Sequence, residues 1–357
     1  MVDIELPFKT IELRGDHLVL LDQRQLPEKV EYVQIEKYKV VIEAIRNMTV
    51  RGAPAIGVVA GFAMFLASVE YSNLPEDGYF RLMSKAADEL SLARPTAANL
   101  RWAVQRIRKI IEGNHGISIA KTHQMVKQEA EAIEAEDKEL CRSIGEHGAA
   151  LINDGDGILT HCNAGALATA GIGTALGVIY TAAFSGKKIR IYSGETRPVD
   201  QGRRLTSWEL AASGLDVTIL CDNMIGSIIS SGKIDKVIVG ADRIAMNGDT
   251  ANKIGTLNMA LIADHFQVPF YVAAPYSTFD PEAQSGADIP IEFRPKDEVA
   301  SAENYVDIHG KIDIYNPAFD VTPVNLITAY ITDRGILTSS ELGAVLMRKA
   351  KNLNQVH

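Results

Sequence analysis

From residue 155 onward, short apolar runs alternate with stretches of helical periodicity, and this alternation constrains the fold more than any other feature. Each apolar run ends in polar residues, as buried parallel strands commonly do. Strand–helix alternation predicts a parallel sheet with helices on both faces, so residues 149–357 are expected to form a Rossmann-like α/β domain. The predicted strands are Ile158–Thr160, Ile189–Tyr192, Val217–Leu220, Val237–Val239 and Phe270–Ala273, and the predicted helices are Ala166–Ser185, Leu205–Ser213, Met224–Ser230 and Asn252–Phe266.

The first part of the chain has a different pattern. Residues 11–36 alternate apolar and polar side chains around turn signals, which predicts short antiparallel strands. From Lys37 to Gly148 the apolar residues recur at helical spacing, and Pro54 and Pro95 each stand near an expected helix start. A chain of 357 residues is long for one core. We therefore expect residues 1–148 to form a smaller strand-plus-helix domain, and we expect the tail, 339–357, to be an amphipathic helix with a frayed end.

Charge and cysteine content narrow the function classes. The formal net charge of −9 argues against nucleic acid or an anionic membrane as the main partner, although a phosphorylated substrate needs only a few local cations. The chain has three cysteines, Cys141, Cys162 and Cys221, which are too few for a disulfide framework. The sequence contains no CxxC and no HExxH motif, so it gives no sign of a metal site. The longest apolar runs, such as Ile56–Ala67, are too short to span a bilayer. These features favour a cytoplasmic enzyme acting on a small molecule.

Chemically useful residues follow the predicted strands. Ligands of such sheets bind beyond the carboxyl ends of the strands. The thiol of Cys162 and the carboxylate of Asp242 both occupy such positions. If the small residues after Cys162 open a helix, its N-terminus would favour the thiolate, whereas the alternative is a buried structural cysteine. Asp242 follows an apolar strand and two small residues, so partial desolvation would raise its pKa and suit an acid catalyst.

Several segments are candidates for binding an anion. Arg51 precedes small residues, including Gly52 and Ala53, and a proline at a helix start, a combination that can cradle a phosphate. Arg94 repeats the arginine-before-helix arrangement, although either arginine alone would more often form a structural ion pair. Asn252 and Lys253 are expected at another helix start, where the alternative is a capped helix with surface charges.

A glycine-rich segment, Gly171–Gly177, superficially suggests a dinucleotide loop. Its spacing is GxGxxxG, and it is expected inside a helical stretch rather than between a strand and a helix. The sequence therefore argues against a nicotinamide cofactor and favours close helix packing.

Taken together, these motifs resemble the methylthioribose-1-phosphate isomerase family, from about Leu20 to Gly335. The matching segments occur in the family's order. They are Arg51–Gly57, Arg94–Thr96, Cys162–Gly165, Glu195–Pro198, Gly240–Ile244, Asn252–Thr256, Ser277–Asp280, Ile289–Glu292 and Asn316–Asp320.

The resemblance implies an isomerase that converts 5-methylthioribose 1-phosphate into the ketose 5-methylthioribulose 1-phosphate, a step of methionine salvage. It implies a homodimer, no metal and no organic cofactor, with Cys162 and Asp242 as the catalytic pair. The implied ligands of the substrate and its phosphate are Arg51, Gly52, Ala53, Arg94, Gln201, Asn252 and Lys253.

Two positions depart from the family pattern. Gly194 stands where a cysteine or an acidic residue is expected, and Phe293 stands where a second glutamate is expected. The group on C5 of the sugar therefore stays open. Related proteins offer three alternatives: a 5-deoxyribose-1-phosphate isomerase, a ribose-1,5-bisphosphate isomerase, and a scaffold like the regulatory subunits of translation initiation factor 2B.

Overall fold

The computed structural model describes residues 4–94, 97–300 and 312–342, which divide into two compact units. Glu5–Arg142 and Gly165–Gly173 form what we call the N-terminal unit, and the remaining described residues form the C-terminal unit. The helix α5 (Ile119–Ala149) therefore passes from one unit into the other.

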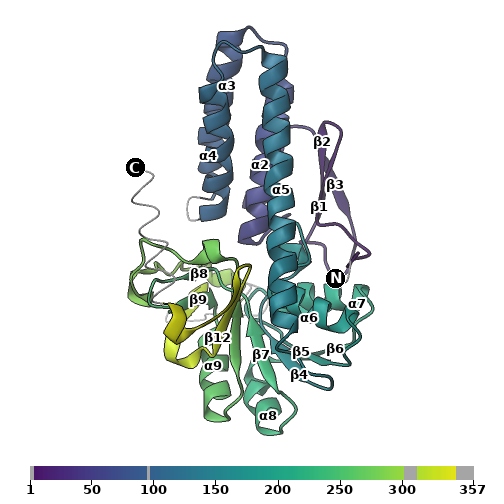
Figure 1. Cartoon of the computed structure of the whole chain (residues 1–357), viewed down its shortest axis with the longest axis vertical. Helices are drawn as coiled ribbons and strands as arrows, with labels where there is room; N and C mark the ends of the chain where they lie inside the picture. Colours follow the sequence, from purple (N-terminus) through teal and green to yellow (C-terminus); the bar gives the residue numbers. More distant parts are fainter. Residues whose placement is uncertain (1–3, 95–96, 301–311, 343–357) are drawn as a thin grey trace. The chain divides into compact units, whose positions relative to one another are not determined.

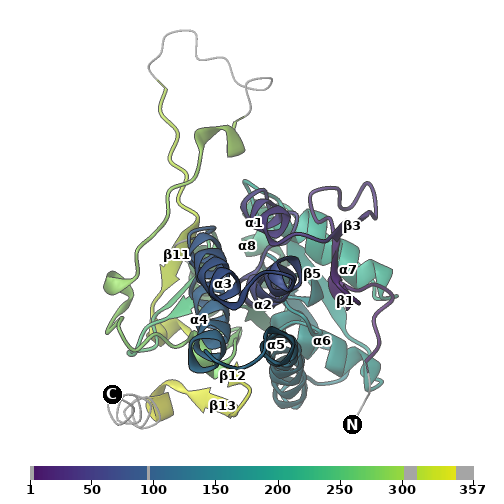
Figure 2. The same cartoon turned by 90° about the horizontal axis from the view of Figure 1, so that it is seen from above.

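The N-terminal unit contains the predicted antiparallel strands, β1 (Ile11–Arg14), β2 (His17–Leu21) and β3 (Tyr32–Ile35), in the order β1-β2-β3. Five helices follow, as the apolar spacing predicts. They are α1 (Tyr38–Arg46), α2 (Ala53–Tyr71), α3 (Glu76–Ser91), α4 (Ala98–Gly113) and α5. Figure 2 shows α2 in the middle of this group.

Helix α2 is the core of the N-terminal unit. Its best 18-residue window has a mean hydropathy of 1.7, so by length and composition it could cross a membrane. The argument that the run Ile56–Ala67 is too short was therefore wrong, because the helix extends beyond it at both ends. However, 78% of that window is buried, and Gly61 lies directly against Ala130 of α5. Its apolar character is thus explained by packing, as in the core helix of a soluble protein.

The C-terminal unit contains a seven-stranded sheet in the order β13-β12-β10-β7-β4-β5-β6. Figure 1 labels β12, β7, β4, β5 and β6 of this sheet. Every neighbouring pair is parallel except β12 and β13, so the predicted α/β class and parallel sheet are confirmed. The strands are β4 (Gly157–Thr160), β5 (Arg190–Gly194), β6 (Val217–Leu220), β7 (Lys236–Val239), β10 (Phe270–Ala273), β12 (Ala329–Thr332) and β13 (Gly335–Thr338). The helices between them are α6 (Ala175–Phe184), α7 (Ser207–Ala212), α8 (Ile225–Ser230) and α9 (Thr256–His265).

Two helix predictions were too long. Residues 166–185 hold only the short turn Ala166–Ala168 before α6 begins at Ala175, so the GxGxxxG segment starts in a loop. A small antiparallel sheet replaces the start of the other predicted helix. It consists of β8 (Arg243–Ile244), β9 (Thr250–Lys253) and β11 (Phe319–Thr322). The tail prediction falls mostly outside the described residues, because they end at 342.

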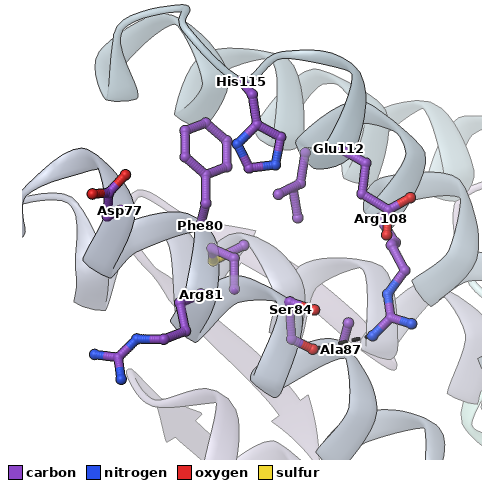
Figure 3. Close-up of a pocket in the computed structure, with 10 residues that line it drawn as sticks. Asp77, Phe80, Arg81, Ser84, Ala87, Arg108, Glu112 and His115 are labelled. Carbon is purple, nitrogen blue, oxygen red and sulfur yellow. Dashed lines mark hydrogen bonds between the residues drawn. The ribbon is translucent and has the colours of Figure 1, made fainter.

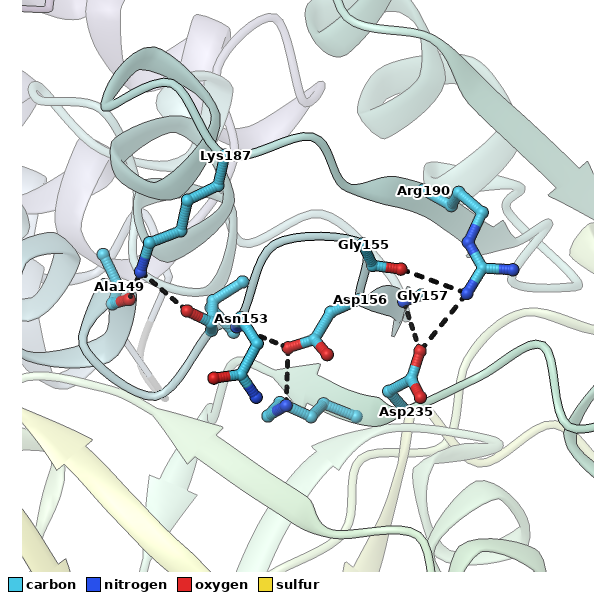
Figure 4. Close-up of polar contacts among 10 residues, drawn as sticks. Ala149, Asn153, Gly155, Asp156, Gly157, Lys187, Arg190 and Asp235 are labelled. Atoms are coloured by element: carbon cyan, nitrogen blue, oxygen red, sulfur yellow. Dashed lines mark hydrogen bonds and ion pairs between the residues drawn. The ribbon is translucent and has the colours of Figure 1, made fainter.

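Polar contacts fix the amino ends of the central strands (Figure 4). Just before β4, the buried carboxylate of Asp156 pairs with Nζ of Lys236 at 2.5 Å and accepts the backbone N–H of Asn153 at 2.7 Å. The Asp235 carboxylate accepts the backbone N–H of Gly157 at 2.6 Å and lies 3.3 Å from the guanidinium of Arg190. These contacts stabilise the edge opposite to the carboxyl ends, where ligands of such sheets bind.

Candidate functional site

Cys162 lies two residues beyond the end of β4, in a strained loop. Its φ is +58°, in the left-handed region that non-glycine residues seldom adopt. Its backbone N–H donates to Oγ1 of Thr196 at 2.9 Å, and its carbonyl accepts from Oγ1 of Thr206 at 2.6 Å. The predicted helix after it is reduced to the short helical turn Ala166–Ala168, and α6 begins only at Ala175. The half-buried thiol is instead positioned by backbone hydrogen bonds.

Thr196 is the second strained residue of this loop cluster. Its φ is +66°, which is costly for a β-branched side chain and persists only where the surroundings impose it. The Asp222 carboxylate imposes it, because it accepts the N–H groups of Thr196 at 2.9 Å and of Arg197 at 2.7 Å. The ends of β4, β5 and β6 are therefore joined, as expected for residues that gather at one edge of the sheet.

His161 joins this cluster to the segment that follows β9. Its side chain is 1% exposed, and burial lowers its pKa, so the ring is neutral at pH 7. Its Nε2 lies 2.8 Å from the carbonyl oxygen of Ile254, which can only accept, so Nε2 carries the proton. Its Nδ1 then faces Oγ1 of Thr196 at 3.4 Å. Sequence reasoning gave no role to His161, although it is a polar residue at the end of an apolar strand.

Gln201 precedes a turn of π-helix, Gly202–Thr206, that packs against the end of β5. A Cβ on Gly202 would lie 1.8 Å from the carbonyl oxygen of Gly194, so only glycine permits this approach. Gln201 itself is 9% exposed. Residues 197–200 form the turn that leads from the end of β5 into Gln201.

Asp242 is attached to the small antiparallel sheet. Its backbone N–H donates to the carbonyl of Ala251 at 3.0 Å, immediately before β8 begins. Its side chain is exposed in this structure. The predicted partial desolvation of this carboxylate is therefore wrong.

Asn252 and Lys253 are the last residues of β9 rather than the start of a helix. The carboxylate of Asp320 accepts the N–H of Gly255 at 2.8 Å and of Leu257 at 3.1 Å, at the beginning of α9. The predicted anion site on free helix amides is therefore wrong, because a side chain already binds these amides. Lys253 instead places its Nζ 4.7 Å from the centre of the Phe319 ring.

The other predicted ligands lie in the N-terminal unit. Gly52 precedes α2 with a φ of +94°, Ala53 begins the helix, and Pro54 lies in its first turn, as predicted. Arg51 and Arg94 are half-buried. Pro95 and Thr96 lie outside the described residues. The structure thus places Cys162, Gln201, Asp242, Asn252 and Lys253 in one unit and Arg51, Gly52, Ala53 and Arg94 in the other.

A cavity of about 400 Å³ lies elsewhere, between α3 and α4 (Figure 3). Its floor is apolar, and charged side chains stand at its rim, among them Asp77, Arg81, Arg108 and Glu112. None of the predicted site residues lines it. Over residues 4–94, 97–300 and 312–342, no group of three histidine, cysteine or acidic side chains could hold a metal ion.

The two departures from the family pattern have different surroundings. A Cβ on Gly194 would lie 3.0 Å from Oδ1 of Asp222 and 3.2 Å from Nδ1 of His161, so a larger residue would press on the strained cluster. Phe293 is 63% exposed and contacts the ring of Tyr315 edge-on, at 5.5 Å between ring centres.

The fold and these loops define a Rossmann-like α/β protein with a candidate ligand site at the carboxyl edge of its sheet. The chain matches the model of the Initiation factor 2 subunit family over residues 49–339, and it belongs to that family. The resemblance drawn from the motifs is also confirmed. Methylthioribose-1-phosphate isomerase of Geobacter sulfurreducens is 48% identical over 331 residues, covering 93% of this chain and 96% of that protein. The protein of the same name from Caldicellulosiruptor saccharolyticus is 47% identical over 331 residues, which cover 92% of this chain and 96% of that protein.

Two solved structures are similar to the whole chain. The 5-methylthioribose 1-phosphate isomerase from Pyrococcus horikoshii has a TM-score of 0.91 and 39% identity, covering 98% of this chain and 97% of that one. A structure described as translation initiation factor eIF-2B, subunit delta, from A. fulgidus has a TM-score of 0.87 and 40% identity. The similarity covers 95% of this chain and 99% of that one. Fold similarity alone therefore does not separate an isomerase from an initiation factor subunit.

Proposed function

We propose that this protein is a methylthioribose-1-phosphate isomerase, which converts 5-methylthioribose 1-phosphate into 5-methylthioribulose 1-phosphate. The observation that carries the proposal is the strained loop that presents Cys162 at the carboxyl edge of the sheet. Strained backbone persists where function needs it, and a scaffold protein has no need of a positioned thiol. The relatives that share 47–48% identity over most of the chain carry this enzyme's name.

Cys162 and Asp242 are the proposed catalytic pair. The phosphate on C1 of the substrate leaves no free aldehyde, so the ring must open first. Asp242 would protonate the ring oxygen, which breaks its bond to C1 and leaves a cation-like carbon there. Asp242 is exposed, so the bound sugar, rather than the protein alone, would desolvate it and raise its pKa.

Hydrogen must then move from C2 to C1, and two routes remain. In the first, the Cys162 thiolate removes the C2 proton to give an enol phosphate and returns a proton to C1. In the second, hydride passes directly from C2 to C1, and Cys162 stabilises the developing charge. In both routes the C2 hydroxyl gives its proton to the Asp242 carboxylate, which restores the acid.

We propose that seven residues bind the substrate and its phosphate: Arg51, Gly52, Ala53, Arg94, Gln201, Asn252 and Lys253. We also propose that residues 1–148 and 149–357 act as the two functional domains, and that the enzyme works without a cofactor as a cytoplasmic homodimer.

The test is incubation of the purified protein with 5-methylthioribose 1-phosphate in D₂O, followed by proton NMR. Formation of the ketose supports the proposal, and no ketose contradicts it. Deuterium at C1 identifies the proton route, whereas complete retention of hydrogen is expected both for the hydride route and for a Cys162 that returns the same proton before it exchanges with solvent.

One observation favours a second candidate, a scaffold subunit. The A. fulgidus protein described as an initiation factor subunit is as similar in sequence as the Pyrococcus enzyme. The presence of both Cys162 and Asp242 weighs against this reading, because scaffolding uses neither group. The same incubation separates the two candidates.

A further inference from the structure

The segment Gly165–Gly173, which we call the excursion, begins three residues after Cys162. It belongs to the N-terminal unit, although the chain on either side belongs to the C-terminal unit. Its two ends are closed by a β-bridge between Gly165 and Gly173. Just outside it, the N–H of Thr174 donates to the carbonyl of Ala164 at 2.9 Å. The backbone that follows Cys162 is therefore anchored through this closed loop.

Three side chains hold the excursion: one from the loop before β1, one from the loop after β2, and one from α5. Oγ1 of Thr10 donates to the carbonyl of Ala166 at 2.7 Å, and Nε2 of Gln23 donates to the carbonyl of Leu167 at 2.7 Å. The Asp137 carboxylate of α5 accepts the N–H of Ala170 at 2.6 Å. Asp137 is the only charged side chain of the three. It accepts a hydrogen bond from the excursion, whereas Thr10 and Gln23 donate hydrogen bonds to it.

The excursion also contacts the proposed phosphate loop. A Cβ on Gly52 would lie 2.6 Å from both Cα and the carbonyl oxygen of Ala168, so the two backbones touch. Gly52 stands beside Arg51 and caps α2. Any displacement of Ala168 would therefore be transmitted directly to the residues that are proposed to bind phosphate.

Asp137 is buried where a carboxylate is costly. It is 7% exposed, and Gly171 packs so closely on the next turn of α5 that a Cβ there would lie 2.8 Å from Cβ of Cys141. A buried carboxylate is tolerated only where hydrogen bonds compensate for its lost hydration. Here the compensating donors come from the excursion itself.

We propose that Asp137 is a positioning residue for the isomerase reaction. By holding the excursion on α5, its carboxylate fixes both the backbone that follows Cys162 and the surface on which Gly52 packs. The inference rests on the proposed function, since it assigns Asp137 to that reaction without any contact with the substrate.

The experiment compares Asp137→Ala with Asp137→Asn. Asn retains an oxygen that can accept the Ala170 N–H, whereas Ala does not. We expect Asp137→Ala to lower kcat at least 10-fold and to raise KM at least 5-fold, and Asp137→Asn to stay within 3-fold of wild type in both. Thr10→Val, which removes the hydrogen bond to the Ala166 carbonyl with little change in shape, should shift both constants in the same direction by a smaller factor.

Asp156→Ala is the matched control, because it removes a buried carboxylate at the opposite edge of the sheet. It should lower the melting temperature and leave KM unchanged. If Asp137→Ala and Thr10→Val lower only the melting temperature, with KM and kcat per folded enzyme unchanged, the proposal is overturned.

A second measurement does not depend on activity. Hydrogen exchange of a peptide spanning residues 165–173 should be at least 10-fold faster in Asp137→Ala than in Asp137→Asn. Equal exchange would refute the anchor even if the enzyme is active. Wild-type protein that is inactive on the sugar but shows this difference would refute the proposed function and leave the anchor in place.

Discussion

The backbone N–H of Cys162 donates to Oγ1 of Thr196 at 2.9 Å, and both residues hold φ in the left-handed region. Cys162 follows β4 and Thr196 follows β5. Strained backbone conformations of this kind are concentrated at active sites, where they hold reacting groups in place. Asp222 completes the arrangement from the end of β6. The position of the thiol is therefore set by three neighbouring strands.

The first prediction concerns the catalytic pair. Cys162→Ser and Asp242→Asn should each lower kcat at least about 100-fold with little change in substrate affinity, as expected for a lost base or acid. Cys221→Ser is the control, because Cys221 also follows a strand but has no proposed role. The measurement is kcat and KM of the three variants by steady-state kinetics. Wild-type turnover in Cys162→Ser or in Asp242→Asn would contradict the catalytic role of that residue.

The second prediction concerns Thr196. Thr196→Val keeps the branched shape but leaves the Cys162 N–H without its acceptor, which costs about 1–3 kcal/mol if the group stays buried. We expect kcat to fall about 10-fold or more, because small displacements of a reacting group are costly. Thr196→Ser keeps the hydroxyl and should recover most of the activity. Equal activities of Thr196→Val and Thr196→Ser would show that the hydrogen bond from the Cys162 N–H does not position the thiol.

The third prediction concerns phosphate. Arg51→Ala and Lys253→Ala should each weaken the binding of inorganic phosphate and of the product, measured by calorimetric titration. Arg51 acts beside the start of α2, and Lys253 acts as a cation at the end of β9. Arg46→Ala is the control, since Arg46 pairs with Glu43 on an exposed face of α1. Unchanged phosphate affinity in both variants would mean that the cradle lies elsewhere.

The fourth prediction concerns the pH dependence of stability. Burial, with a smaller contribution from Glu134, raises the pKa of Asp137 to about 6, although the N–H groups of Ala170 and Gly171 and the charge of Lys138 oppose the rise. The folded protein therefore holds this proton more tightly than the unfolded chain does. The free energy of unfolding should fall as pH rises from about 4 to about 6, by at most about 3 kcal/mol.

Asp137→Asn has no proton to lose, so this part of the pH dependence should disappear. Urea unfolding of both proteins at several pH values measures the difference. Identical slopes between pH 4 and pH 6 would show that Asp137 does not titrate there.

The sheet could be predicted because its strands are buried on both faces and form continuous apolar runs, such as Val237–Val239. The start of the predicted helix at Asn252 was wrong for a physical reason. β9 pairs with β11, whose residues lie far away in the sequence, and no local pattern reveals that partner.

The excursion was also hidden from sequence analysis. Its small residues suit a helix, but Thr10, Gln23 and Asp137 hold it in another conformation from distant positions. The motifs did identify the Cys162 loop and its neighbour at Thr196. They did not reveal the positive φ values or the role of His161, because both depend on tertiary contacts.

The most direct test of the central claim compares kcat/KM for three substrates that differ only at C5: a methylthio group, a plain methyl group, and a phosphate. An apolar pocket separates the first two by only about 10- to 200-fold, so we predict activity on both, with 5-methylthioribose 1-phosphate preferred. A second phosphate should be rejected, because burying a doubly charged group without further cations is unfavourable. A preference for ribose 1,5-bisphosphate, or no turnover of any of the three, would contradict the account.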